Sequence, residues 1–365
     1  MRTRQIIGLL LASTLPLGAH GADQPCQVHV FLFVPSDFEP PPRYQERIDQ
    51  IVDYTEAFFT REFNRWGHED MVMPFRRNSD GHVEVTVMRG KEKAADYKPV
   101  TVRAEVMDEM RRTNALAGGR QIRWIMVYAG NPPKKFAGFL GGYGEQIGGW
   151  SVCNFNTKPG RIHPNMPLGA DSLEEFALKG MIHELGHAFQ LPHIGLLKRD
   201  TAGNTLMGPT NANYRRVMGR GTDQVYLCEA EAAMLSTNPA FRGAVDKPSP
   251  LPKLQTQDMK CAVDARSGGI VVSGRVRSTV RPVYAIVGDE SDERPGEYWT
   301  KTYFGKVEPD GAFEVLVSEP SKSKGTLKTW FAFENGVMTG DGKTRGRSSG
   351  IAKEYTYNRN RWTFN

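Results

Sequence analysis

Hydrophobic residues recur at two different spacings between residues 27 and 240, and each spacing predicts a different kind of element. Apolar residues at every second position, or in short unbroken runs, are typical of β-strands and occupy residues 27–34, 82–88, 122–129 and 150–155. Apolar residues three and four positions apart predict helices and occupy residues 43–66, 100–116, 173–191 and 228–236. This mixture predicts an α+β domain.

Two local signals refine this pattern. Ser172 and Glu175 have the spacing of a capping box, so the third helix is expected to begin at Leu173. Residues 130–149 contain seven glycines and no phosphate-binding motif. We expect them to form an irregular loop, with residues 150–155 as an edge strand beside it.

Beyond residue 252 the pattern predicts strands alone. Residues 247–252 contain three prolines and read as a semi-rigid linker. Strand-like segments follow, separated by turns such as residues 309–311. The chain is therefore expected to consist of an α+β domain at residues 22–246, a linker at 247–252 and a small all-β sandwich at 253–365.

The first 21 residues have the features of a secretory signal peptide. Arg2 and Arg4 precede an apolar run at residues 6–17, and Ala19 and Gly21 supply the small residues of a cleavage site. We expect cleavage after Gly21 and a secreted or periplasmic protein. No later apolar run is long enough to span a membrane, and a net charge of +6 spread over 365 residues indicates no nucleic-acid partner.

The four cysteines are Cys26, Cys153, Cys228 and Cys261. They form no C-x-x-C pair, so they do not indicate a zinc knuckle. In an oxidising compartment they permit two disulfides in three connectivities. Buried thiols are the alternative.

The third expected helix carries the sequence His183-Glu184-Leu185-Gly186-His187. Residues four apart share one helix face, so His183 and His187 can bind one metal ion. Glu184 follows the first histidine and is placed to take a proton from a water molecule on that ion. The alternative is a solvated helix face with two hydrogen-bonded histidines.

Two further residues extend this motif. His193 completes the pattern HExxHxxxxxH, and Met207 follows within Thr205-Leu206-Met207-Gly208-Pro209. Together these residues resemble the signature of metzincin zinc endopeptidases, with its third histidine and Met-turn. More loosely, the chain resembles bacterial secreted metalloproteases with a C-terminal β-domain.

The resemblance implies a role for each motif residue. His183, His187 and His193 would bind Zn²⁺, Glu184 would be the catalytic general base, and Met207 would lie beneath the metal without binding it. It also implies a peptide or protein substrate. The strand at residues 150–155 would pair with an extended peptide.

The sequence departs from the metzincin pattern at Gln190, where the pattern has glycine. That glycine adopts a positive φ and lets the chain return to the metal. We therefore expect the helix to end at or near Gln190. Some metzincins place a tyrosine two residues after the methionine, whereas Tyr214 here follows Met207 by seven. In a rival, gluzincin-like scheme the third ligand is Glu229 or Glu231 of the following helix.

The motif and the domain pattern lead to three functional hypotheses. The first is a secreted zinc-dependent endopeptidase. The second is an exported binding protein with a degenerate zincin domain, whose C-terminal domain holds a glycan or a protein partner. The intact Glu184 argues against degeneracy. The third is a zinc hydrolase that does not act on peptides.

Overall fold

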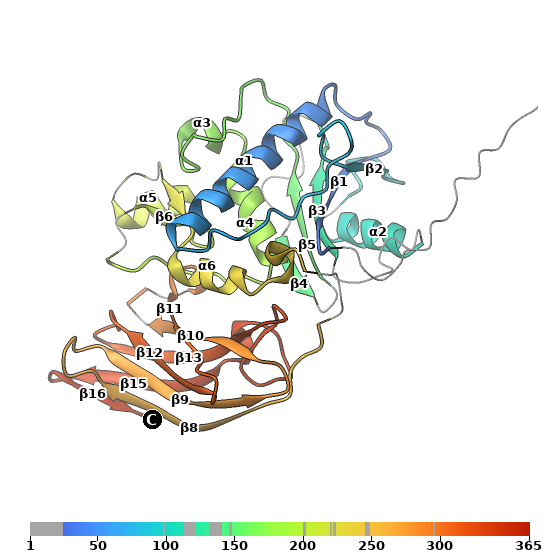
Figure 1. The fold of residues 1–365 in the computed structure, drawn as a ribbon. Coiled ribbons are helices and arrows are strands. Elements are labelled where there is room, and N and C mark those ends of the chain that lie inside the picture. The colour runs from blue at the N-terminus through green and yellow to red at the C-terminus, as the bar shows by residue number, and fades with distance from the viewer. Residues whose placement is uncertain are drawn as a thin grey trace, which may run out of the picture.

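The computed structural model of the chain describes residues 25–97, 99–112, 121–130, 141–145, 148–199, 202–219, 221, 224–244, 249–291, 293–294 and 296–365. The expected signal peptide lies outside these residues, as do parts of the glycine-rich stretch (131–140), the second expected helix (113–116) and the linker (247–248). The described residues form an N-terminal part of helices and strands and a C-terminal part built mainly of strands (Figure 1). No helix among them has the length and apolar character needed to cross a membrane.

A five-stranded sheet with the strand order β2-β1-β3-β5-β4 forms the centre of the N-terminal part. Its strands are β1 (Val28–Val34), β2 (Val85–Arg89), β3 (Gln121–Val127), β4 (Gly141–Glu145) and β5 (Gly148–Asn154). Four of them run parallel, and β4 is antiparallel to β5. Parallel strands are covered on both faces, which is why β1 and β5 are almost continuously buried.

The expected position of the edge strand is wrong. Residues 150–154 belong to β5, which lies between β3 and β4. Among the described residues the edge strand on this side of the sheet is β4, which lies in the glycine-rich stretch where the sequence predicts an irregular loop. Glycine has a low preference for strands, so the sequence pattern does not reveal this element.

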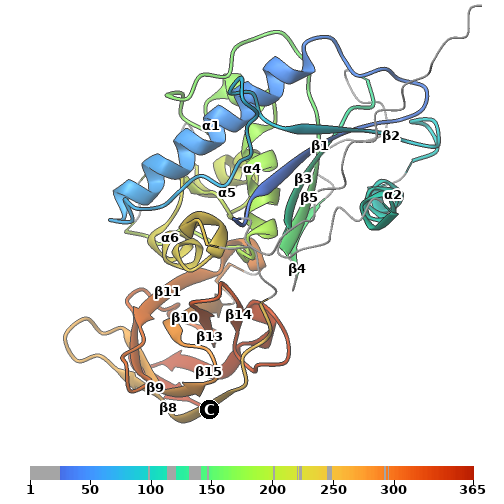
Figure 2. The ribbon, with the colours of Figure 1, turned by 45° about the vertical axis from the view of Figure 1, so that its right-hand side comes forward.

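Helices cover both faces of the sheet. They are α1 (Tyr44–Arg65), α2 (Pro99–Arg112), α3 (Asp171–Glu174), α4 (Leu178–Ala188), α5 (Asn211–Met218), α6 (Glu229–Ser236) and the 3₁₀ helix η1 (Pro239–Arg242); a short parallel pair, β6 (Asn204–Thr205) and β7 (Val225–Tyr226), lies between α4 and α6 along the chain. Side chains of α1 and α4 pack with Val30 and Trp124, whereas Val102 and Val106 of α2 pack with Phe31 on the opposite face. Figure 2 shows α1 and α4 on one side of the sheet and α2 on the other.

The single helix expected at residues 173–191 is divided into α3 and α4. Ala177 lies between them with φ 53°, in the left-handed region that interrupts a helix. Leu173 and Phe176 are both buried in the core of the N-terminal part, so tertiary packing of this turn outweighs the helical periodicity. The expected capping box is also wrong, because α3 begins before Ser172.

The C-terminal part contains two antiparallel sheets. The larger has the order β11-β10-β13-β15-β16, with β14 beside β13, and the smaller has the order β12-β9-β8. Their strands are β8 (Leu254–Val263), β9 (Ile270–Ser278), β10 (Pro282–Ser291), β11 (Lys301–Lys306), β12 (Ala312–Val317), β13 (Lys324–Phe333), β14 (Met338–Thr339), β15 (Ile351–Asn358) and β16 (Arg361–Phe364), with 3₁₀ helices η2 (Glu297–Trp299) and η3 (Arg347–Ser349). β11 starts at Lys301, directly after η2.

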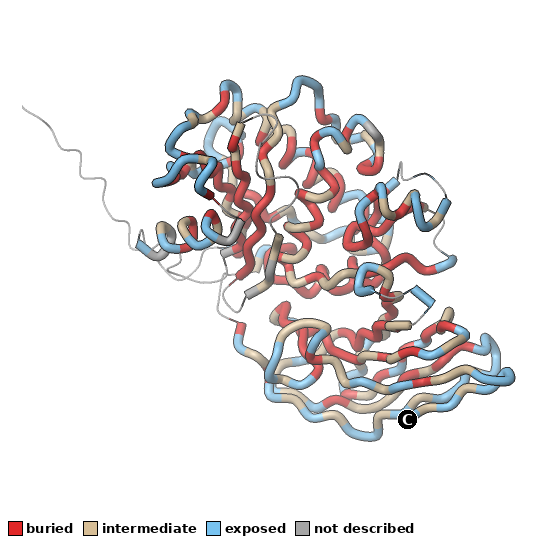
Figure 3. Tube along the Cα trace, turned by 180° about the vertical axis from the view of Figure 1, so that it is seen from behind, coloured by how far each residue is buried: buried red, intermediate tan, exposed pale blue. Residues whose placement is uncertain are grey.

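The middle of the larger sheet, at β10 and β13, is buried on both faces. Phe331 and Phe333 of β13 pack between the two sheets, whereas Trp330 and Ala332 belong to the hydrophobic core of the N-terminal part. Alternate residues of a strand point to opposite faces, so β13 supplies both cores at once. Figure 3 shows buried residues gathered where the two parts meet, and exposed residues along the smaller sheet.

The four cysteines do not form the two disulfides that the sequence permits. Cys153 and Cys261 are free thiols. Cys153 is completely buried on β5, and this burial raises the pKa of its thiol.

Candidate metal centre

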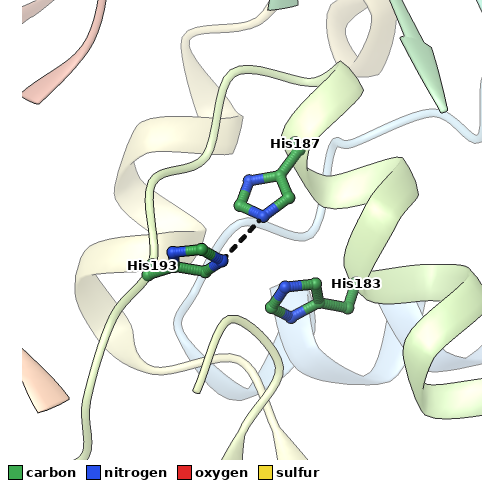
Figure 4. A group of neighbouring side chains, drawn as sticks. All are labelled: His183, His187 and His193. Carbon is green, nitrogen blue, oxygen red and sulfur yellow. Dashed lines mark hydrogen bonds between the residues drawn. The ribbon is translucent and has the colours of Figure 1, made fainter. Parts of the chain in front are cut away.

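Three histidines converge at the C-terminal end of α4. His183 and His187 lie one turn apart on this helix, and His193 lies in the loop that follows it. Figure 4 shows their rings turned toward one another. One ring nitrogen from each histidine lies within 4.8 Å of the other two, and the Nε2 atoms of His187 and His193 are 3.0 Å apart.

The turn after α4 brings His193 back to the helix. α4 ends at Ala188, and Gln190 has φ 75°, in the left-handed region. This conformation costs a residue with a side chain on the order of 1 kcal/mol. Leu191 stabilises the turn, because its side chain is buried and its N–H donates to the carbonyl of Gly186 at 3.0 Å. The helix therefore ends near Gln190, as the sequence predicts, although no glycine is present.

Each imidazole has a hydrogen-bond acceptor beside its Nδ1 atom. Nδ1 of His183 lies 2.8 Å from the carbonyl oxygen of Leu206, and Nδ1 of His187 lies 2.8 Å from that of Leu191. Nδ1 of His193 lies 2.9 Å from a carboxylate of the C-terminal part. Since Nδ1 must carry the proton to donate to these acceptors, the lone pair of each neutral ring is on Nε2.

This donor set fits a metal ion such as zinc. A tetrahedral zinc with nitrogen ligands at 2.0–2.1 Å holds them about 3.4 Å apart, close to the 3.0 Å between Nε2 of His187 and of His193. Burial lowers the pKa of all three rings, well below the ordinary value for His183 and to about 4 for His193. The rings are therefore neutral near pH 7, as metal ligands must be.

Glu184 lies beside His183 on the wall of a cavity of about 270 Å³. Burial raises the pKa of Glu184 to about 7. A carboxyl group with this pKa can accept and release a proton near neutral pH, which is what a general base requires.

The triad lies between this cavity and a second one. The smaller cavity is lined by residues of α4, of the segment after Met207 and of η2, among them Lys179, His183, Glu184, Asn211 and Tyr298. The second cavity, of about 430 Å³, lies between the two parts of the chain, and its lining includes Gly142, His187, His193, Arg345 and Arg347. Room for a substrate therefore exists on both sides of the triad.

Met207 lies beneath the triad and is completely buried. A Cβ atom on Gly186 would be 2.6 Å from the sulfur of Met207, so the methionine packs directly against the helix between His183 and His187. Tyr214 is also completely buried, on α5, and lines neither of the two cavities. The described structure therefore gives Tyr214 no place beside the triad.

Neither glutamate of the rival ligand scheme joins the histidine cluster among the described residues. Glu231 is completely buried, and its carboxylate accepts the backbone N–H of Met207 at 2.9 Å. It thus supports the turn that contains Met207. Glu229 is half exposed and lies 3.8 Å from Arg199. The third member of the cluster with His183 and His187 is therefore His193.

The C-terminal part contributes two side chains that the sequence analysis missed. The carboxylate beside Nδ1 of His193 is that of Glu297. The ring of Tyr298 lies over the ring of His193, with their centroids 3.8 Å apart. Both residues belong to η2 and are part of no recognisable sequence motif. Their position beside His193 is seen only when the two parts of the chain are packed together.

Glycines let the sheet lie directly on α4. A Cβ atom on Gly142 of β4 would be 2.2 Å from the carbonyl oxygen of Glu184, and one on Gly149 of β5 would be 2.0 Å from that of Ala188. Gly142 and Gly149 are therefore explained by close contact with the helix that carries the motif. β4 is the last strand of its sheet among the described residues, and its Gly142 lines the larger cavity together with His187 and His193.

Comparison with known proteins identifies structural neighbours and no sequence relatives. No protein-family model and no curated protein matches the sequence. The fold is similar to crystal structures of OgpA from Akkermansia muciniphila. The catalytically inactive form, in complex with an O-glycopeptide substrate, matches with a TM-score of 0.69 and 20% identity over 94% of this chain and 96% of that chain. The wild-type form matches with a TM-score of 0.69 and 19% identity over the same shares. At this identity the likeness shows the fold, including both parts of the chain.

Proposed function

We propose that this protein is a secreted, zinc-dependent endopeptidase, with a metzincin-like zincin domain followed by a β-sandwich. One observation carries the proposal: three neutral imidazoles present Nε2 to a common point, and Glu184 lies beside them with a pKa that burial raises to about 7. Structural histidines are not usually arranged in this way, because their lone pairs would face one another without a cation between them.

The chain's own residues suit peptide hydrolysis. When bound, zinc lowers the pKa of a coordinated water to about 7 and polarises the carbonyl group to be attacked. Glu184 takes a proton from the attacking water and passes it to the leaving amine. Met207 fixes α4 from below, so that His183 and His187 keep their spacing. The edge of β4 can pair with an extended peptide by strand addition.

We infer that the substrate is an O-glycosylated peptide or protein. This inference is supported by the similarity in fold to OgpA, one of whose structures holds an O-glycopeptide substrate. A second support is the cavity between the two parts of the chain, which leaves room beside His187 and His193 for more than a peptide backbone.

The test uses one peptide in two forms, with and without an O-linked glycan on a single residue. The purified protein, with its zinc content measured, is incubated with each form and the products are identified by mass spectrometry. We expect cleavage of the glycosylated form, and loss of at least about 10²-fold in rate for Glu184→Gln with zinc retained.

The two alternatives predict other results. An exported binding protein would retain the glycopeptide without cleaving it, and a zinc hydrolase of another class would bind zinc but leave both peptides intact. A Glu184→Gln variant that cleaves at the wild-type rate would contradict the proposed mechanism.

A further inference from the structure

His193 is held differently from the other two histidines of the triad. His183 and His187 are positioned by α4 and by backbone carbonyls of the N-terminal part. His193 lies in a loop, where no helix fixes the direction of its ring. The partner of its Nδ1 atom is a side chain of the C-terminal part, the carboxylate of Glu297, at 2.9 Å.

The C-terminal part holds His193 at three points. Besides the contact with Glu297, the ring of Tyr298 covers its imidazole, with centroids 3.8 Å apart. Arg347 donates a hydrogen bond from its guanidinium to the backbone carbonyl oxygen of His193 at 3.1 Å. The ring face, the ring nitrogen and the backbone of one residue are thus all fixed from the same side.

The neighbouring backbone joins the two parts at the same place. The N–H of Gly195 donates to the carbonyl oxygen of Thr300 at 2.8 Å. A Cβ atom on Gly195 would lie 2.5 Å from the carbonyl carbon of Trp299, so only glycine allows this approach. The loop that carries His193 is therefore packed against the segment that carries Glu297.

Glu297 is itself held in place. Arg347 lies 3.5 Å from its carboxylate and donates to the hydroxyl of Thr300 at 2.9 Å. The side chain of Arg347 is only 12% exposed, whereas that of Glu297 is 56% exposed. An exposed glutamate usually gains little from such order, so its alignment with Nδ1 of His193 calls for a role at the ring.

The geometry points to Glu297 as a positioning residue for the metal centre. This inference rests on the proposed function, in which His193 binds zinc. By accepting the Nδ1 proton, Glu297 fixes the ring orientation and tautomer that present Nε2 to the metal, and it increases the basicity of that nitrogen. The C-terminal domain thus completes the metal centre of the N-terminal domain.

The test measures zinc affinity of the full-length protein by competition with a chromophoric chelator. Loss of a partner of this kind typically costs 10–100-fold in metal affinity. We expect a loss of that size for Glu297→Ala and a smaller loss for Glu297→Gln, whose amide oxygen can still accept from Nδ1. Glu314→Ala, an exposed carboxylate on β12 of the same domain, is the control and should bind zinc as the wild type does.

If Glu297 had a purely structural role, removing its side chain would lower the unfolding temperature of the metal-free protein. The positioning role predicts no such change. Because the side chain is more than half exposed, the metal-free Glu297→Ala protein should unfold at the same temperature as the metal-free wild type. The cobalt-substituted variant should show a changed visible spectrum, because the ligand ring is no longer held.

The outcomes separate this inference from the proposed function. Wild-type zinc affinity in Glu297→Ala, or a loss explained by a lower unfolding temperature of the metal-free variant, would overturn the positioning role alone. If Glu297→Ala binds zinc 10–100-fold more weakly and the zinc-loaded wild type cleaves no peptide, the positioning role would be supported and the peptidase refuted.

Discussion

Gly142 lies so close to Glu184 that a Cβ atom on the glycine would be 2.2 Å from the carbonyl oxygen of the glutamate. This contact joins the edge strand β4 to the helix that carries the metal motif. The oxygen belongs to the backbone of α4, so it cannot move away without displacing the helix. The position of the edge strand and that of the triad are therefore set by the same contact.

Substituting Gly142 by alanine should force β4 and α4 apart. We expect Gly142→Ala to destabilise the protein by about 1–3 kcal/mol, the usual cost of overpacking, and to reduce peptide hydrolysis. Gly144→Ala is the matched comparison on the same strand, because its nearest neighbour is a side-chain atom, Cγ of Gln190, and the backbone Cα of Gln190 lies farther away, at 3.1 Å. Urea unfolding should show the smaller loss for Gly144→Ala, and equal losses would contradict this explanation.

Hydrolysis should decrease as the pH falls below neutrality. Burial raises the pKa of Glu184 to about 7, and a general base acts only when ionised, so a raised pKa moves the loss of activity to higher pH. A bound cation favours the ionised form, so the acid limb of kcat/KM should lie between about 4.3, the ordinary value for glutamate, and about 7. A pH profile of kcat/KM without an acid limb would count against Glu184 as the base.

Zinc affinity should depend on the side chain of His193 and not on that of Glu229. His193→Ala removes a proposed ligand and should lower zinc affinity by orders of magnitude, more than the 10–100-fold typical of a supporting residue. Glu229→Ala removes a half-exposed side chain outside the triad and should leave the affinity unchanged. Chelator competition on both variants decides between the two ligand schemes, and the reverse result would favour the gluzincin-like one.

Trp330 should stabilise both parts of the chain at once. Its side chain is completely buried, and it packs in the N-terminal core although it lies on β13 of the C-terminal part. We expect Trp330→Ala to cost about 3–5 kcal/mol and to lower the unfolding temperature of the whole chain in a single transition. The half-buried Trp362 of β16 packs against the other core, away from this interface, and Trp362→Ala should be milder. Two separate transitions in the wild type would contradict a shared core.

The elements that the sequence predicts well are long or continuously apolar. The periodicity of residues 43–66 closely matches α1, and the apolar run at residues 122–129 covers all of β3 except its first residue. The elements that it misses depend on contacts made elsewhere in the chain. β4 is recognisable as a strand only beside β5, and Ala177 interrupts a regular helical pattern because Leu173 and Phe176 are buried around it.

The candidate site divides in the same way. His183, Glu184 and His187 follow from the geometry of one helix, and His193 follows from where that helix ends. Glu297 and Tyr298 could not be predicted, because their place depends on how two sheets and a loop dock together. A local motif therefore defines the ligands, whereas their support comes from residues more than a hundred positions away in the sequence.

The contact between Glu297 and His193 also links two equilibria. If an ion bound at Nε2 of His193 favours the ring orientation that Glu297 holds, then binding the ion strengthens the attachment of the second domain. Thermodynamic reciprocity requires the docked domain to strengthen ion binding by the same factor. Removing the ion with a chelator would then weaken the contact between the two parts of the chain. Conversely, a partner that pulled the two parts apart would weaken ion binding.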